Sequence, residues 1–371
     1  MKIAIDCRIA SYTSGGTAVY VRRLVERFAA WPDPGPDEFT LLEAAQGRNP
    51  VLGQLPAHIR SRRLVTPSHH RWEQLLLPLE LALERFDLLH SPDFIPPFRR
   101  RYRSVITVHD LAFLRYPQFL TAPSRRYFNG QIRAAVQSAD RIIAVSNATK
   151  QDLIAEVGAS PGKIDVVYEA ADPLLRPEAD RAAIAGFLEG HRLPGDYVLF
   201  VGTLEPRKNL PVLIQAFATL RRKGYAGQLV LAGARGWLYD QVFSEIERLE
   251  LQPAVVLAGP LEPGDLRCLY NGARLLAFPS VYEGFGLPVL EAMSCGLPVV
   301  TSNVSSLPEV AGDAALLVDP SSPEELATAM ERVLGDPSLA DSLRQRGLAR
   351  AGEFSWERAA AETLAVYHRA A

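Results

Sequence analysis

The chain has 371 residues, of which 48% are hydrophobic and 22% charged, a globular composition that excludes extended disorder. Its net charge of −2 excludes the strongly basic field of a nucleic-acid-binding protein, and three widely spaced cysteines without a C-x-x-C pair exclude a disulfide framework and a zinc finger. No apolar run approaches the ~18 residues of a membrane-spanning helix, and the first apolar run is too short for a signal peptide, so we expect a cytoplasmic protein.

Strand patterns alternate with amphipathic helical patterns through the first 170 residues. The chain opens with a strand at Ile3–Cys7, and a turn at Gly15-Gly16 leads into a helix at Ala18–Ala30. Further strands are predicted at Phe39–Leu42, Arg63–Val65, Asp87–His90, Ser104–Val108 and Arg141–Val145. Further helices are predicted at Trp72–Glu84, Ser124–Ser138 and Asn147–Val157.

A proline-punctuated segment follows, and the alternation then begins again. The second set of strands is apolar on both faces, as buried parallel strands are, and is predicted at Tyr197–Val201, Gln228–Leu231, Ala254–Leu257, Arg274–Phe278, Pro298–Thr301 and Ala315–Val318. Helices are predicted between and after them at Leu210–Arg222, Tyr239–Glu250, Asp265–Asn271, Leu287–Cys295, Pro323–Leu334, Ser338–Gly352 and Trp356–Ala371.

These patterns predict an α/β fold of two doubly wound, Rossmann-like domains with parallel sheets, facing each other across a cleft. We place an N-terminal domain at residues 1–170, a linker at 171–195 and a C-terminal domain at 196–355. The last helix, at 356–371, is expected to pack back toward the N-terminal domain.

Charge is distributed unevenly between the two halves. Residues 1–170 hold 22 Lys and Arg against 17 Asp and Glu, and the remainder holds 18 against 25, so the halves carry +5 and −7. The basic excess is clustered at Arg60–Arg63, Arg99–Arg103 and Arg125-Arg126. Two interpretations stay open: a solvated surface, or a patch that binds an anionic acceptor or anionic lipid at a membrane.

Several common catalytic motifs are absent from the sequence. There is no P-loop, no G-x-S-x-G nucleophile elbow, no H-E-x-x-H and no D-x-D pair, so we expect no metal site. The adjacent His69 and His70 have no acid or cysteine at metal-ligand spacing and are interpreted as surface residues. The stretch from Gly284 to Val289 begins like a dinucleotide fingerprint but lacks its third glycine, which disfavours a nicotinamide cofactor.

The most informative stretch follows the strand at Arg274–Phe278 and reads SVYEGFGLPVLEAM. Gly284 and Gly286 allow close approach of the backbone to a ligand, and the helix that starts beside them favours an anion such as a diphosphate. Glu283 precedes this helix and Glu291 lies inside it. Carboxylates accept hydrogen bonds from hydroxyls but repel phosphates, so both glutamates are interpreted as ligands of sugar hydroxyls.

The E-x7-E spacing of Glu283 and Glu291, together with the sequence GTLEPRKN at residues 202–209, resembles retaining glycosyltransferases of family 4, which have the two-domain GT-B fold. The resemblance covers essentially the whole chain, from the N-terminal glycine turn to the sequence LPEV at 307–310. It is strongest to bacterial mannosyltransferases that build polysaccharides or lipid-linked glycans.

The resemblance implies a binding site for a nucleotide-sugar donor. Its residues would be Gly16, Gly202, Arg207, Lys208, Leu261, Glu283, Gly284, Phe285, Gly286, Leu287 and Glu291. By similarity Glu291 binds the ribose, Glu283 binds the donor sugar and Lys208 binds the diphosphate. The chain departs from the pattern at Thr203, where many members carry an arginine, and Arg207 is the candidate substitute.

The same resemblance implies a catalytic set of His109, Lys208 and Glu283, without a metal or cofactor. His109 follows the strand Ser104–Val108, so it is expected at a carboxyl end of the sheet, where it would contact the sugar hydroxyls or steady positive charge near the transferred sugar.

The implied reaction is a retaining, metal-independent transfer of a hexose to a glycan or lipid-linked acceptor, with GDP-mannose as the leading donor and a UDP-sugar as the other. The chain would act in the cytoplasm, without nucleic-acid partners, and its basic clusters leave peripheral contact with the inner face of a membrane open. Two alternatives also stay open: a nucleotide-sugar 2-epimerase and a non-catalytic sugar-nucleotide-binding protein.

Overall fold

The computed structural model describes residues 1–12, 15–31, 35–47, 50–119, 122–236 and 239–371. It divides into two compact units, which are described separately. The N-terminal unit consists of Met1–Glu169 and Ser355–Ala371, and the C-terminal unit consists of Ala170–Phe354.

The N-terminal unit is built on a seven-stranded parallel sheet in the order β3-β2-β1-β4-β5-β6-β7. Its strands are β1 (Lys2–Asp6), β2 (Glu38–Ala44), β3 (Ile59–Leu64), β4 (Leu88–Ser91), β5 (Arg103–Val108), β6 (Arg141–Ala144) and β7 (Ile164–Val166). The order reverses direction beside β1, which makes the sheet doubly wound, as predicted. The strand expected at Arg63–Val65 lies earlier in the chain, and β7 was not predicted.

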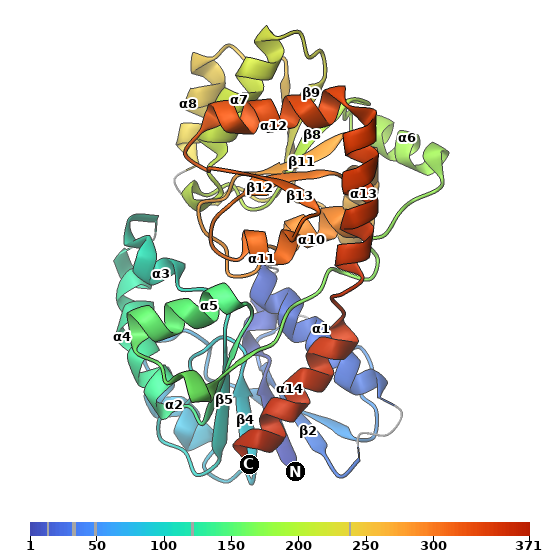
Figure 1. The fold of residues 1–371 in the computed structure, drawn as a ribbon. Coiled ribbons are helices and arrows are strands. Elements are labelled where there is room, and N and C mark those ends of the chain that lie inside the picture. The colour runs from blue at the N-terminus through green and yellow to red at the C-terminus, as the bar shows by residue number, and fades with distance from the viewer. Residues whose placement is uncertain (13–14, 32–34, 48–49, 120–121, 237–238) are drawn as a thin grey trace. The chain divides into compact units, whose positions relative to one another are not determined.

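Helices cover both faces of this sheet (Figure 1). They are α1 (Gly16–Ala30), α2 (Glu73–Glu80), α3 (Ala112–Arg115), α4 (Ala122–Ser138), α5 (Asn147–Asp152), which continues as a π-helical turn (Leu153–Val157), and α14 (Trp356–Ala370). The alternation of β5 shows how the two faces differ: Ile106 and Val108 belong to the core under α4, whereas Thr107 points to the opposite face. Strands buried on both sides explain the continuous apolar runs in the sequence.

The last helix, α14, is part of the core of the N-terminal unit. It packs on α1, β5 and β6, and its Tyr367 hydroxyl lies 2.7 Å from Nδ1 of the buried His90. His90 in turn lies 2.8 Å from the Thr107 hydroxyl, which also contacts Tyr20. Burial lowers the pKa of His90 to about 3, so this histidine is a neutral hydrogen-bonding residue within the core.

The C-terminal unit is built on a six-stranded parallel sheet in the order β10-β9-β8-β11-β12-β13. Its strands are β8 (Tyr197–Val201), β9 (Gln228–Ala232), β10 (Val255–Gly259), β11 (Leu275–Phe278), β12 (Val299–Ser302) and β13 (Ala315–Val318). They agree with the predicted strands to within about two residues. The two parallel sheets confirm the predicted α/β fold class.

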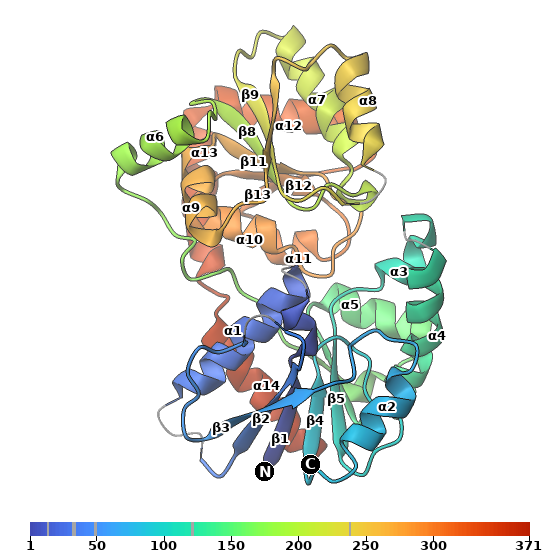
Figure 2. The ribbon, with the colours of Figure 1, turned by 180° about the vertical axis from the view of Figure 1, so that it is seen from behind.

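Helices also cover both faces of the second sheet, with α7 and α12 on one face and α9 and α10 on the other (Figure 2). The helices are α6 (Arg181–Gly190), α7 (Leu210–Arg222), α8 (Asp240–Arg248), α9 (Pro263–Gly272), α10 (Leu287–Ser294), α11 (Leu307–Ala311), α12 (Pro323–Gly335) and α13 (Pro337–Ala351). None of the helices among the described residues is long and apolar enough to cross a membrane.

The segment 171–195 contains a helix that our linker prediction did not include. Helix α6 starts after Asp180, whose carboxylate accepts hydrogen bonds from the backbone N–H groups of Ala182 and Ala183. It buries Ile184 and Leu188 and packs against α9. Asp180, a favourable N-cap residue, was the sequence signal for this helix. The prolines just before Asp180 favoured a linker instead.

Candidate active site

The turn after β8 carries two cationic side chains at the carboxyl edge of the C-terminal sheet. Gly202 follows the strand with φ +151°, and a Cβ there would lie 3.3 Å from the Phe200 ring. A 3₁₀ turn at Pro206–Lys208 follows. Asn209 anchors the start of α7, because its side-chain amide donates to the carbonyl of Pro279 at 3.1 Å. This fixed turn determines where Arg207 and Lys208 lie.

Arg207 and Lys208 converge on one carboxylate, that of Glu283. Arg207 Nη1 lies 2.7 Å from Glu283 Oε2, and Lys208 Nζ lies 2.6 Å from Oε1. The Ser280 hydroxyl donates to the same Oε1 at 2.5 Å. A second carboxylate, that of Glu205, holds the other side of the Arg207 guanidinium at 2.8 Å.

This cluster is removed from water. Glu283 is 6% exposed and Lys208 7%. Burial alone would raise the pKa of Glu283, but the charges of Arg207 and Lys208 outweigh burial and lower it to about 2. Burial and the nearby Arg207 charge lower the pKa of Lys208, while Glu283 opposes that shift. Glu283 is therefore an ionised counter-ion between two cations.

The loop that carries Glu283 is held at several points. The Val281 N–H donates to the Arg207 carbonyl at 3.0 Å, which ties the loop to the cationic turn. The Glu283 N–H donates to the Ser305 hydroxyl at 2.9 Å. The Ser306 hydroxyl contacts the carbonyls of Glu283 and Phe285 at 2.9 and 2.7 Å. These contacts orient the Glu283 carboxylate without a ligand.

Gly286 is required by the turn into α10. Its φ is +110°, and a Cβ there would lie 2.8 Å from Leu307 Cδ2, so an L side chain would be strained and crowded. The helix begins at Leu287, with Pro288 in its first turn. The side chain of Phe285 is buried and its ring contacts Phe354 edge to face.

Glu291 lies inside α10 and has a different environment from Glu283. Its Oε2 accepts a hydrogen bond of 2.8 Å from the Tyr270 hydroxyl on α9. Burial raises the pKa of Glu291 to about 7, although the Tyr270 hydrogen bond opposes the shift. Of the two glutamates in the E-x7-E pair, one is held ionised and the other titrates near neutrality.

His109 lies directly after β5, at the carboxyl edge of the N-terminal sheet, as expected from the sequence. Its Nδ1 lies 3.0 Å from Glu169 Oε1 and its Nε2 lies 3.0 Å from the Pro92 carbonyl oxygen. Both partners present acceptor oxygens, so these contacts favour the protonated form of the ring. Burial would lower the pKa of His109, but Glu169 outweighs burial and raises it. Both expected roles of His109 beside the transferred sugar remain predictions.

A second charged cluster lies at the carboxyl edge of the N-terminal sheet. The fully buried Arg8 guanidinium lies 2.6 Å from Asp6 Oδ2 and 2.6 Å from Glu73 Oε1. Close by, His69 forms an ion pair with Asp93. The interpretation of this histidine pair as surface residues holds for His70, which is exposed, whereas His69 is partly buried and contacts Asp93, which lies 24 positions later in the chain.

Comparison with known protein families identifies the chain. Residues 14–173 match the model of "Glycosyltransferase Family 4", and residues 189–350 match that of "Glycosyl transferases group 1". An O-antigen chain mannosyltransferase B of Escherichia coli is 34% identical over 85% of this chain and 81% of that protein. The chain belongs to glycosyltransferase family 4. It is a glycosyltransferase that uses a nucleotide sugar.

Solved structures show the same fold as this glycosyltransferase. A sucrose-phosphate synthase of Thermosynechococcus elongatus superimposes with a TM-score of 0.81 at 24% identity, over 100% of this chain and 98% of that chain. Anabaena Alr3699/HepE, solved in complex with UDP-glucose, superimposes with a TM-score of 0.75 at 20% identity, over 98% and 99% of the two chains.

The structure places the remaining predicted donor residues as follows. Gly284 lies in the loop before α10, and Leu261 lies just after β10. Gly16 is the first residue of α1, and a Cβ there would meet no described atom within 4 Å. The assignment of these residues to the donor remains a prediction.

Several residues that contact the predicted site residues within the two units were not themselves predicted. They are Glu205, which orients Arg207, Tyr270, which contacts Glu291, Glu169, which contacts His109, and the loop-holding Ser280, Ser305 and Ser306. Glu205 had a sequence signal, because an acid two positions before an arginine in a tight turn can reach its guanidinium. The other contacts join segments separated along the chain.

Within the described part of the chain, no group of three or more His, Cys, Asp or Glu side chains is arranged to hold a metal ion. Metal independence remains a prediction, which the chelation experiment below tests.

Proposed function

We propose that this glycosyltransferase transfers a hexose, with mannose from GDP-mannose as the leading case, to a glycan or lipid-linked acceptor with retention of anomeric configuration. The observation that carries the proposal is the convergence of Arg207 and Lys208 on the buried Glu283 beside the start of α10. A buried cation needs an anionic partner: in the ligand-free protein Glu283 is that partner for the buried Lys208 and the partly buried Arg207, and the diphosphate of a nucleotide sugar would take its place.

Donor binding would rearrange the charges of the cluster. In the structure Glu283 is the counter-ion of both cations. A bound diphosphate would take over Lys208 and Arg207, which leaves the Glu283 carboxylate available for the hydroxyls of the donor sugar. The cations would then stabilise the negative charge that grows on the diphosphate as the bond to the sugar breaks.

Retention fits a route without a protein nucleophile. The bond from the anomeric carbon to the phosphate oxygen would break while the acceptor oxygen bonds to the same face of that carbon. The acceptor proton would pass to the departing phosphate oxygen, which balances the step without a general base. A covalent glycosyl–enzyme route needs a reactive carboxylate. The pKa of Glu283, lowered to about 2 by Arg207 and Lys208, makes it a weak nucleophile.

The choice of mannose is supported by the similarity to a mannosyltransferase of Escherichia coli. A UDP-sugar is the competing donor, since HepE was solved with UDP-glucose. The experiment that separates them is a thermal-shift panel of GDP-, UDP-, ADP- and dTDP-sugars, in which a ligand at 100 times its Kd adds about 2.7 kcal/mol of stability. We expect GDP-mannose to give the largest shift; a larger shift with a UDP-sugar would overturn the assignment of the base.

Transfer activity is expected to survive EDTA. The charge on the leaving diphosphate would be met by Lys208 and Arg207, so a divalent cation is not needed for this purpose. The measurement is the initial rate of nucleoside diphosphate release with acceptor present, before and after chelation and dialysis. A rate that disappears with EDTA and returns with added Mg²⁺ or Mn²⁺ would contradict the metal-independent route.

Donor affinity is expected to depend on the ionisation of Glu291. Ribose hydroxyls donate hydrogen bonds to a carboxylate, so binding favours the ionised form of a group whose pKa is raised to about 7 by burial. Affinity for an intact nucleotide sugar should therefore fall as the pH drops below about 7, by at most about tenfold per pH unit, with proton release on binding. Titration calorimetry at several pH values measures the affinity, and its repetition in two buffers of different ionisation enthalpy measures the proton release.

The matched variant for this prediction is Glu291→Gln. It keeps the size of the side chain and cannot titrate, so it should bind the donor more weakly and with no dependence on pH in this range. A wild-type affinity that is constant from acidic to slightly alkaline pH would show that Glu291 is not a ligand of the ribose.

A further inference from the structure

An apolar face on the outside of α2 has no packing partner among the described residues. Leu77 and Leu81 point inward and join the core of the N-terminal unit. On the outer side, five large side chains are exposed along the helix and the residues next to its two ends: Trp72, Leu75, Leu76, Leu79 and Leu83. Leu75, Leu76 and Leu79 have the i, i+1, i+4 spacing of one helix face, and Trp72 and Leu83 flank them just before and after the helix; we call these five residues the α2 face.

The exposure of this face is unusual for the molecule. Twelve large hydrophobic side chains are exposed in the described part of the chain, and five of them are on the α2 face, with Leu79 73% and Leu83 94% exposed. A sixth, Val65, lies next to α2, because its N–H donates to Glu80 Oε1 at 2.6 Å. Large contiguous apolar patches on a folded surface mark interaction sites.

The acidic side chains of this segment do not share the outer surface with the α2 face. Glu73 is buried against Arg8, and Glu80 accepts hydrogen bonds from the backbone of Val65 and Thr66. Glu84 forms an ion pair with Arg62. The exposed charges that flank the face are cations: Arg71 precedes it, with its guanidinium 5.4 Å from the Trp72 ring, and Arg85 follows it.

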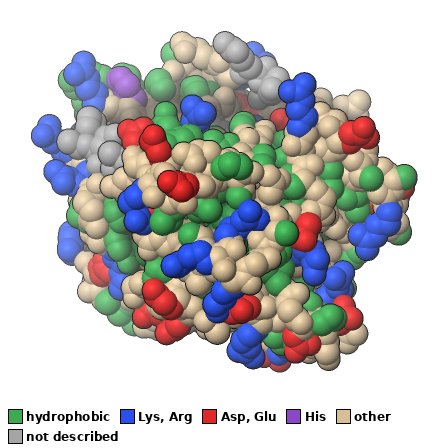
Figure 3. Space-filling model, turned by 90° about the horizontal axis from the view of Figure 1, so that it is seen from above, with side chains coloured by type: hydrophobic (Ala, Val, Ile, Leu, Met, Phe, Trp, Pro, Cys, Tyr) green, Lys and Arg blue, Asp and Glu red, His purple; other side chains and the backbone are tan. Residues whose placement is uncertain are grey.

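The excess of exposed arginines over exposed acidic side chains extends to the residues on either side of this helix. From residue 60 to 103, where every residue is described, one acidic side chain, Asp87, is exposed. Seven arginines in that stretch are exposed: Arg60, Arg63, Arg71, Arg85, Arg99, Arg101 and Arg103. By contrast, the face of the molecule in Figure 3 mixes Lys and Arg with Asp and Glu, and its hydrophobic side chains are dispersed.

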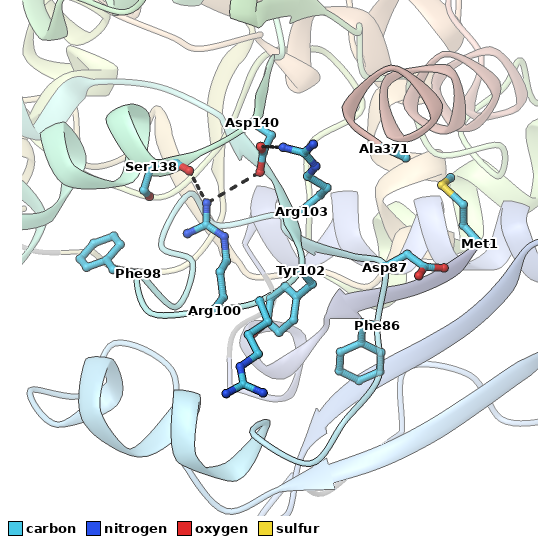
Figure 4. Close-up of a pocket in the computed structure, with 11 residues that line it drawn as sticks. Met1, Phe86, Asp87, Phe98, Arg100, Tyr102, Arg103, Ser138, Asp140 and Ala371 are labelled. Atoms are coloured by element: carbon cyan, nitrogen blue, oxygen red, sulfur yellow. Dashed lines mark hydrogen bonds and ion pairs between the residues drawn. The ribbon is translucent and has the colours of Figure 1, made fainter.

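The arginine cluster at Arg99–Arg103, which the sequence suggested as an anion-binding patch, is partly used within the fold. Arg103 Nη1 lies 2.8 Å from Asp140 Oδ1, and the Arg100 guanidinium contacts the Ser138 carbonyl and lies 3.9 Å from Asp140 (Figure 4). Arg100 and Arg103 line a pocket of about 750 Å³ that Met1 and Ala371 also line. This cluster alone therefore offers fewer available cations than its sequence implies.

We propose that the α2 face docks the protein on an anionic lipid bilayer. A helix with Trp and Leu on one face and arginines at its margins lies in the membrane interface, with its apolar side among the acyl chains and its cations at the headgroup phosphates. Arg71 and Arg85 stand at the two ends of the face, where such contacts form. The proposal goes beyond the transfer reaction, because the docking needs neither donor nor acceptor.

The test is co-sedimentation of the full chain with vesicles of phosphatidylcholine, with and without phosphatidylglycerol, at low and physiological salt. We expect binding to the anionic vesicles that weakens with salt, and at least tenfold weaker binding to phosphatidylcholine alone. The double variant Leu79→Asp/Leu83→Asp should bind the anionic vesicles at least tenfold more weakly. Both positions are highly exposed, so its melting temperature should match wild type.

Three further variants sharpen the test. Leu174→Asp, an equally drastic change at an exposed leucine of the C-terminal unit, should bind as wild type. Arg71→Ser and Arg85→Ser should each weaken binding about fivefold. The tryptophan emission of wild type should shift to shorter wavelength on vesicles. The Trp72→Phe variant should lose the part of this shift that Trp72 contributes.

Two results would overturn the proposal. One is equal vesicle binding, or none, by wild type and the Leu79→Asp/Leu83→Asp variant. The other is a wild-type dimer in analytical ultracentrifugation that the double variant abolishes, without vesicle binding, which would make the α2 face an interface between two copies of the chain. Because these assays contain no nucleotide sugar, failure here leaves the proposed transfer reaction untouched.

Discussion

Replacing Lys208 with methionine is expected to lower kcat about a hundredfold to a thousandfold, the usual loss when one preorganised charge-stabilising donor is removed. Lys208 is the more buried of the two cations on Glu283, and methionine keeps most of its volume. The affinity for nucleoside diphosphate should fall as well, because the same ammonium would bind the diphosphate. Steady-state transfer rates and calorimetric titration measure the two effects.

The matched control is Lys223→Ala in the same unit. Lys223 also forms an ion pair with a glutamate, Glu331, but both side chains are about half exposed, so its removal should change neither kcat nor stability measurably. If Lys208→Met keeps wild-type kcat while remaining folded, Lys208 does not stabilise the leaving group.

Replacing Glu283 with glutamine is expected to separate binding from turnover. In the ligand-free protein Glu283 competes with any diphosphate for Arg207 and Lys208. Its removal should leave nucleoside diphosphate affinity unchanged or raise it, while kcat falls because the donor sugar loses its carboxylate. Without ligand the variant should be less stable by about 3–5 kcal/mol, because the buried Lys208 ammonium loses its ion-pair partner, whereas Arg207 keeps Glu205.

Addition of nucleoside diphosphate should restore part of that stability, since the diphosphate replaces the missing counter-ion. Thermal unfolding with and without ligand measures this, and Glu331→Gln, at an exposed ion pair, is the control. A Glu283→Gln variant that loses both nucleoside diphosphate affinity and turnover to the same degree would contradict the assignment of Glu283 to the sugar.

The fold was largely predictable because its strands are buried on both faces. Tyr197–Val201 is a run of five apolar residues with the same bounds in sequence and structure, since each face meets a helix layer. The edge strand β3 was misplaced because its sequence, IRSRRL, pairs with a single neighbour and leaves its central residues exposed. The three-residue strand β7 is too short for any periodicity to appear.

The candidate site was predictable only in part. Gly286, Glu283 and Glu291 lie within a few residues of one another, so local spacing was sufficient to find them. The ion pair of Arg207 with Glu283 joins residues 76 positions apart, and nothing local predicts it. The sequence therefore indicated two similar sugar-binding glutamates, whereas the fold makes Glu283 a permanent ion and gives Glu291 a pKa of about 7.

The stereochemistry of the product tests the proposed retaining transfer most directly. The protein is incubated with GDP-mannose, whose anomeric linkage is α, and a synthetic mannoside acceptor on a lipid-like aglycone, and the purified product is examined by NMR. We predict one mannose added per GDP released, in an α linkage, with the Lys208→Met variant forming the same product about a hundredfold to a thousandfold more slowly. A β-linked product, or free mannose or its epimer formed equally well without acceptor, would contradict it.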